Sequence, residues 1–87
     1  MKNPEVSAHY QALKERYALI EAFIAARSAA GLTQEEIAAR MGTTQSAIAR
    51  LEGGKVSPSL DTLYKYAQAA GVRPVISFEP LFESPSP

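Results

Sequence analysis

The sequence of this 87-residue chain predicts an all-α domain. Two observations carry this prediction: apolar residues recur at helical spacing along most of the chain, and glycines and capping residues separate the helical stretches. The length agrees with this prediction, because 87 residues are enough for one small hydrophobic core. The only segment with a strand pattern is short and lies near the C-terminus.

The first expected helix covers residues 4–30, and Gly31 is expected to end it. Its apolar residues at helical spacing are Val6, Tyr10, Leu13, Tyr17, Ile20, Phe23 and Ile24. This pattern is long, and its first part need not pack on the rest of the molecule. We therefore expect residues 1–16 to form an N-terminal helical extension.

Two short helices with a tight turn between them are expected next. Thr33 is expected to cap the second helix, and Glu36 completes a capping box three residues later. Gly42 ends this helix, and Thr44 or Thr43 caps the third. The inner faces are expected to be Ile37, Ala38 and Met41 in the second helix and Ala47, Ile48 and Leu51 in the third. Helices this short must pack on other elements to be stable.

This helix–turn–helix arrangement can present side chains to the major groove of DNA. A tight turn between two helices needs a small residue where they cross, supplied by Ala38, and a residue that tolerates positive φ, supplied by Gly42. On these residues the segment resembles the helix-turn-helix of the lambda-repressor/Cro (Xre) family. The resemblance implies a lambda-repressor-like domain of the five-helix type over residues 17–72, acting as a sequence-specific DNA-binding repressor.

The outward face of the third helix holds the candidate base-reading residues. A glutamine amide can pair with adenine, and an arginine can bond guanine at two positions. The resemblance implies base contacts on this helix and a phosphate contact by Gln34. The candidate DNA-binding residues are Gln34, Thr43, Thr44, Gln45, Ser46, Ala49, Arg50 and Lys55. The alternative is that these side chains only solvate a surface helix.

Charge agrees with a modest DNA-binding surface. The chain has nine basic and nine acidic residues, and residues 40–58 carry three cations against one carboxylate. A local positive face of this kind is enough to contact phosphates. The family resemblance also implies a structural ion pair between Arg27 and Glu52, tying the first helix to the end of the third.

Ser59 is expected to cap a fourth helix, and Gly71 to end it. Its apolar face is expected to be Leu60, Leu63, Tyr64, Ala67 and Ala70. Residues 73–80 follow as a short strand with no β partner in the chain, so we expect it to pair with the same strand of a second copy across a dimer. The alternative is an extended segment lying on its own domain. Residues 81–87 are expected to be a disordered tail.

Composition argues against catalysis, cofactors and metals. The chain has no cysteine and a single histidine, His9, which no triad-like framework accompanies. We expect no enzyme activity, no cofactor and no metal. There is no long apolar run and no signal-peptide pattern, so we expect no membrane association and a cytoplasmic location, with nucleoid association when the protein is bound to DNA.

The layout of the whole chain resembles antitoxins of the HigA type. That resemblance implies a homodimer that represses its own operon at double-stranded operator DNA and neutralises a RelE/HigB-like ribonuclease toxin. The N-terminal extension is then the candidate toxin contact, through the apolar stripe of Val6, Tyr10 and Leu13. Two alternatives remain open: a free-standing Xre-family or phage-type repressor without a toxin, and a protein-interaction module that has lost DNA binding.

Overall fold

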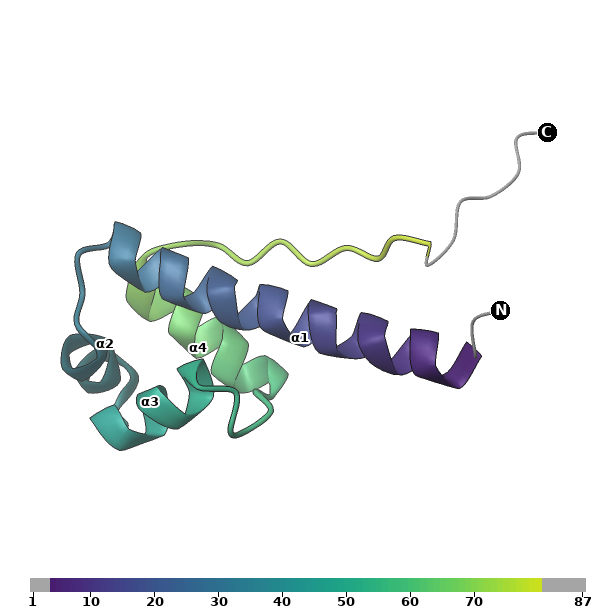
Figure 1. The fold of residues 1–87 in the computed structure, drawn as a ribbon. Coiled ribbons are helices and arrows are strands. Elements are labelled where there is room, and N and C mark those ends of the chain that lie inside the picture. Colours follow the sequence, from purple (N-terminus) through teal and green to yellow (C-terminus); the bar gives the residue numbers. More distant parts are fainter. Residues whose placement is uncertain (1–3, 81–87) are drawn as a thin grey trace.

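The computed structural model describes the backbone of residues 4–80 and the side chains of residues 13–80. Within this range the chain forms four helices: α1 (Pro4–Ala29), α2 (Gln34–Met41), α3 (Gln45–Glu52) and α4 (Leu60–Ala70) (Figure 1). The prediction of an all-α, lambda-repressor-like domain with a long first helix is confirmed. The expectation of five helices is wrong for the described residues, because Gly71 ends α4 in the left-handed conformation and Pro74 and Pro80 interrupt the nine residues that follow.

The expected strand is not formed in the single chain. Residues 72–80 are extended and carry no regular secondary structure, and in Figure 1 they turn back from the end of α4 and run in the direction of the N-terminal end of α1. The physical reason is that a strand is defined by its ladder of backbone hydrogen bonds, and the other elements of the described range are helices. Residues 81–87, expected to be disordered, lie outside the described residues.

Local capping sets the boundaries of the three short helices. Thr33 and Glu36 form the complete capping box at the start of α2. Thr44, rather than Thr43, caps α3 through a hydrogen bond from the backbone N–H of Ala47. Gly42 takes φ 69°, a left-handed conformation that lets the chain turn sharply from α2 into α3.

The core lies where α2, α3 and α4 pack beneath the C-terminal half of α1. Tyr66, Ile37 and Ile48 are its largest fully enclosed side chains, and the Tyr66 ring lies 4.6 Å from that of Phe23. The predicted face of α4 is wrong in part, since Tyr66 and Ala69 are buried while Leu60 and Tyr64 are exposed. The buried face of α4 is therefore rotated about the helix axis from the face that the sequence predicted.

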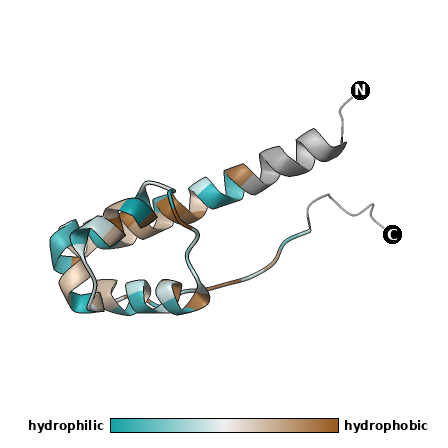
Figure 2. Cartoon of the chain, turned by 90° about the horizontal axis from the view of Figure 1, so that it is seen from below, coloured by the Kyte–Doolittle hydropathy of each residue, from teal (hydrophilic) through white to brown (hydrophobic). Residues whose placement is uncertain are grey.

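The N-terminal half of α1 projects beyond the other helices (Figure 1), and the coloured part of α1 in Figure 2 already extends past them. One unbroken helix runs through residue 16, where the expected extension meets the domain. Arg16 joins α1 to the loop after α3, since its Nη2 donates to the carbonyl oxygen of Gly54 at 3.0 Å. Leu13 and Tyr17 are exposed, and the side chains of Val6 and Tyr10 lie outside the described residues.

Candidate nucleic-acid interface

The third helix separates a buried face from an exposed one. Ile48 and Leu51 point into the core and fix the helix on the domain. The opposite face is open: Gln45, Ser46 and Arg50 are exposed, and Ala49 is half-buried. The remaining candidate residues on this side, Thr43 and Thr44 before α3 and Lys55 after it, are also exposed.

Gln45 is held by a side-chain bond across the turn. Its Nε2 donates to Gln34 Oε1 at 2.6 Å, and Gln34 Nε2 donates to Glu52 Oε1 at 3.0 Å. Gln34 thus lies between the first residue of α3 and the last. The carbonyl oxygen of the Gln45 amide and its second N–H are not used in this contact, so one donor and one acceptor remain to bond the edge of a base.

Arg27 and Glu52, predicted to form an ion pair, are joined by two hydrogen bonds. Arg27 Nε lies 2.8 Å from Glu52 Oε2, and Nη2 lies 2.9 Å from Oε1, which is the bidentate geometry that suits a guanidinium and a carboxylate. Arg27 Nη1 also donates to the carbonyl oxygen of Leu32. One arginine of α1 therefore holds both the loop before α2 and the end of α3.

Tyr66 is a member of this network that the sequence reading missed. Its hydroxyl lies 2.7 Å from Glu52 Oε2 and 2.9 Å from the carbonyl oxygen of Phe23. The sequence held one signal for this role, a tyrosine next to the alanines of α4. If such a tyrosine is buried, its hydroxyl needs a hydrogen-bond partner.

Burial and the contacts within this network shift the pKa values of its titratable side chains. Burial alone raises the pKa of the Glu52 carboxyl, but hydrogen bonds from Arg27, Tyr66 and Gln34 outweigh it, so the pKa is lowered. The hydrogen bond to Glu52 raises the pKa of the Arg27 guanidinium. Burial first, and the Glu52 carboxylate second, raise the pKa of the Tyr66 hydroxyl. The end of α3 thus holds a carboxylate at neutral pH.

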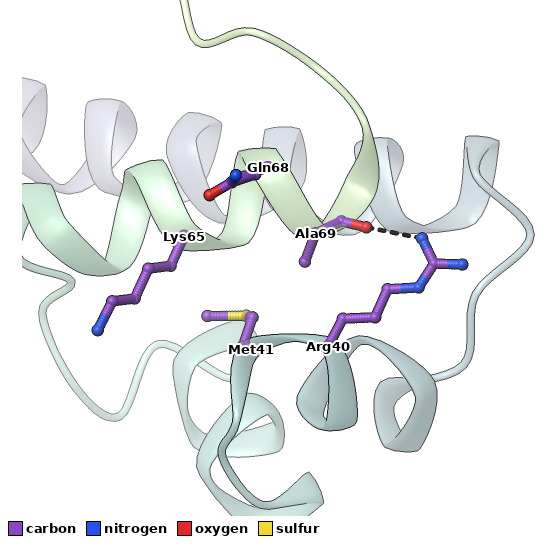
Figure 3. A pocket seen from close by; sticks show the side chains of 5 residues that line it. All are labelled: Arg40, Met41, Lys65, Gln68 and Ala69. Carbon is purple, nitrogen blue, oxygen red and sulfur yellow. Dashed lines mark hydrogen bonds between the residues drawn. The ribbon is translucent and has the colours of Figure 1, made fainter.

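Arg40 is one of the three cations counted in the predicted positive face, but it lies on α2 and not on the exposed face of α3. It lines a shallow hollow of about 470 Å³ between α2 and α4, together with Met41, Lys65, Gln68 and Ala69 (Figure 3). Its Nη1 donates to the carbonyl oxygen of Ala69 at 3.0 Å, so it fastens α2 to the end of α4. Of the three cations counted between residues 40 and 58, Arg50 and Lys55 remain for a DNA-facing surface.

The described residues contain no group of three or more histidine, cysteine, aspartate or glutamate side chains placed to hold a metal ion. Among these same residues, no helix has both the length and the apolar character needed to span a membrane.

Comparison with known proteins identifies the arrangement. The Helix-turn-helix family profile matches residues 24–76, which include α2, the turn, α3 and α4. The chain belongs to the Xre-type helix-turn-helix family. As a member it is a DNA-binding transcriptional regulator and not an enzyme.

Relatives of this family match different shares of the chain. An HTH-type transcriptional regulator, y4dJ of Sinorhizobium fredii, is 44% identical over 63 residues, which are 72% of this chain and 82% of y4dJ. An XRE-family like protein from Pseudomonas syringae superposes with a TM-score of 0.67 at 33% identity, covering 75% of this chain and 80% of that one.

Antitoxin HigA1 of Mycobacterium tuberculosis is 34% identical over 86 residues. The match takes in 97% of this chain and 58% of HigA1, so the chain spans little more than half the length of that relative.

Proposed function

We propose that this regulator is the antitoxin of a type II HigBA/RelE-like operon, which it represses as a homodimer and whose toxin it neutralises. The observation that carries the proposal is the extent of the similarity to HigA1. The similarity covers 97% of the chain, whereas the helix-turn-helix profile matches only residues 24–76. The N-terminal part of α1 is therefore included in what the two proteins share.

On the DNA side, Gln45 and Arg50 read base edges, with Thr44, Ser46 and Ala49 beside them. Thr43 and Lys55 contact phosphates at the two ends of α3. Gln34 has two roles: its amide oxygen orients Gln45 through the 2.6 Å hydrogen bond, and its remaining N–H reaches the phosphate next to that base. Support comes from the exposure of this face and from the network that fixes it on the domain.

The proposed homodimer suits an operator made of two half-sites. A homodimer places two copies of α3 in successive major grooves about one helical turn apart. In this proposal residues 17–72 are the DNA-binding domain, and residues 73–80 pair with their counterparts in an antiparallel ribbon. The protein works in the cytoplasm, where it associates with the nucleoid when it is bound to DNA.

On the toxin side, the projecting part of α1 is the contact. Val6, Tyr10 and Leu13 recur at helical spacing, and the exposed Tyr17 continues this row toward the domain. An apolar row on a helix that extends past its own core suits a groove on a partner protein.

Co-expression with a RelE/HigB-like toxin encoded next to the gene tests this role. We expect Val6→Asp/Tyr10→Asp to abolish rescue of growth while leaving operator binding in a gel shift unchanged. Ala18→Asp/Ala22→Asp is the matched control, since it places the same two charges at the same spacing on another, exposed face of α1. Full rescue by the Val6→Asp/Tyr10→Asp variant would remove this segment from the inhibitory contact.

The second candidate is a free-standing repressor without a toxin. It is favoured by the similarity to y4dJ, an HTH-type transcriptional regulator. Operator binding together with the absence of a toxin gene beside the regulator would support this reading. A chain that binds its partner but shifts no operator fragment would instead be a protein-interaction module.

A further inference from the structure

Arg16 lies outside the helix-turn-helix, but its side chain reaches the end of α3. It is exposed on α1, and its Nη2 donates to the carbonyl oxygen of Gly54 at 3.0 Å. Gly54 follows the C-cap of α3, and in Figure 1 the loop after α3 lies on the same side of α1 as α3 itself. The contact therefore brings a cation of α1 to the end of the helix that is proposed above to read DNA.

Lys55 lies next to this contact. The Gly54 carbonyl and the Lys55 N–H belong to one peptide unit, so the Arg16 guanidinium lies no more than about 5 Å from the Lys55 backbone nitrogen. The same N–H donates to the carbonyl oxygen of Arg50 at 2.9 Å, which fixes Lys55 against the last turn of α3. The side chains of Arg16 and Lys55 are both exposed. Two cations thus share one short loop at the end of α3.

Neither of these two cations is neutralised by an acid of the described side chains. Arg27 is paired with Glu52, but no described carboxylate lies within ion-pair distance of Arg16 or Lys55. An arginine carries five N–H donors, and the Gly54 carbonyl occupies one of those of Arg16. The remaining donors form a planar fork that suits phosphate oxygens. A phosphate bound at this loop would also relieve the repulsion between the two positive charges.

We infer that Arg16 contacts the phosphate backbone of DNA beside Lys55, so that the DNA interface extends from the helix-turn-helix onto α1. This inference rests on the DNA-facing surface proposed above. A phosphate contact carries no base information, but it positions the duplex and adds affinity for every sequence. Arg16 also replaces Arg40 as the third cation of that surface, since Arg40 is bonded to the end of α4.

The bond to Gly54 prepares the arginine for this role. A free, exposed arginine loses rotamer freedom when it binds a phosphate, and that loss weakens binding. Arg16 is already held at the loop by the Gly54 carbonyl, so less freedom is lost on binding DNA. The competing role is purely structural: Arg16 holds the loop, and Lys55 alone meets the backbone. The two roles predict different results for the double variant described below.

The salt dependence of DNA binding tests the contact, because each phosphate contact adds about 0.9 to the magnitude of the slope of log K against log salt concentration. Binding of a random-sequence duplex is measured by fluorescence anisotropy over a series of KCl concentrations. We expect Arg16→Gln to lower the slope by about 0.9 and Arg16→Lys, which keeps the charge, to retain it. Arg73→Gln is the matched control, since Arg73 is an exposed arginine beyond the end of α4.

The double variant Arg16→Gln/Lys55→Gln separates a direct contact from a structural role. A slope lowered by the sum of the two single losses supports the inference. A double variant that loses no more than Lys55→Gln alone shows that Arg16 only holds the loop, and it overturns the inference. An unchanged slope in Arg16→Gln, or an equal loss in Arg73→Gln, overturns it as well. If the unmodified chain binds neither this duplex nor the DNA upstream of its own gene, the proposed DNA-facing surface itself fails.

Discussion

The hydroxyl of Tyr66 on α4 lies 2.7 Å from Glu52 Oε2, at the last residue of α3. The same carboxylate is bonded by Arg27 from α1 and by Gln34 from α2, so all four helices meet at one buried acid. Gln34 in turn accepts a hydrogen bond from Gln45, which lies on the exposed face of α3. The position of the candidate base-reading residue is thus linked to the core by three successive hydrogen bonds.

Removing the acid should destabilise the domain strongly. Glu52→Ala leaves Arg27 half-buried without its carboxylate, and breaking one side of such a pair costs about 3 kcal/mol of unfolding free energy. Tyr66→Phe keeps the ring against Phe23 and removes only the hydroxyl, at a cost of about 1–2 kcal/mol. Urea unfolding of both variants and the double variant measures these costs. The double variant should lose less than the sum, because the two groups share one network; strict additivity would show that they act independently.

Glu52 should also govern stability in acid. Its pKa is lowered in the folded protein, so its contribution is fully present above the ordinary value of 4.5 and is lost as the pH falls through the folded value. The unfolding free energy of the unmodified chain should therefore decline as the pH falls below about 4.5, and Glu52→Gln should flatten this decline. Glu21→Gln on the exposed side of α1 is the control, and an unchanged slope in Glu52→Gln would contradict the assignment.

Helix boundaries were predictable because they depend on neighbours in sequence. The capping box of Thr33 and Glu36 involves residues three apart, and Gly42 and Gly71 supply the left-handed conformation that ends a helix. The position of Arg27 opposite Glu52 came from family resemblance rather than from any local pattern. Its two hydrogen bonds are visible only once α1 and α3 are packed together.

The buried face of α4 could not be settled by periodicity. Leu60 and Tyr64 fit a helical row as well as Tyr66 and Ala70 do, and both rows include Ala67. Tyr66 takes the core because its hydroxyl finds Glu52, fourteen residues earlier in the chain. The bond between Gln34 and Gln45 was missed for a related reason, since it forms across the turn and depends on the angle between two helices.

Two glycines with the same backbone conformation should differ in tolerance to alanine. Gly71 (φ 75°) has open space around an added Cβ, so Gly71→Ala should cost only the left-handed penalty of about 1 kcal/mol. At Gly54 (φ 74°) the added Cβ would lie 3.2 Å from Ile20 Cδ1, so Gly54→Ala should cost about 1 kcal/mol more. Thermal unfolding of the two variants compares them directly, and equal losses would mean that Ile20 moves aside freely.

The C-terminal segment should control assembly rather than folding. Deleting residues 74–87 removes Val75, Ile76 and Phe78, which are exposed in the single chain, and leaves the helical core intact. We expect this truncation to convert a dimer to a monomer and to weaken operator binding far more than it lowers the melting temperature. Deleting only residues 81–87 is the control and should leave the dimer. Sedimentation velocity decides the matter: a truncated chain that still dimerises would place the interface elsewhere.

Base recognition should depend on Gln45 and Arg50. Replacing either with alanine removes a bidentate partner for a base, so specific affinity should fall by about 1–3 kcal/mol and selectivity should relax at one base position. Gln34→Ala should affect the same base position as Gln45→Ala, because the Gln34 side chain holds the Gln45 amide through the 2.6 Å hydrogen bond.

Gln68→Ala on α4 is the matched control, since Gln68 is an exposed glutamine that lines the hollow of Figure 3. Binding is measured by fluorescence anisotropy against operator fragments substituted one base pair at a time. If the Gln45→Ala and Arg50→Ala variants keep the affinity and the base preferences of the unmodified chain, α3 does not read the operator through these side chains.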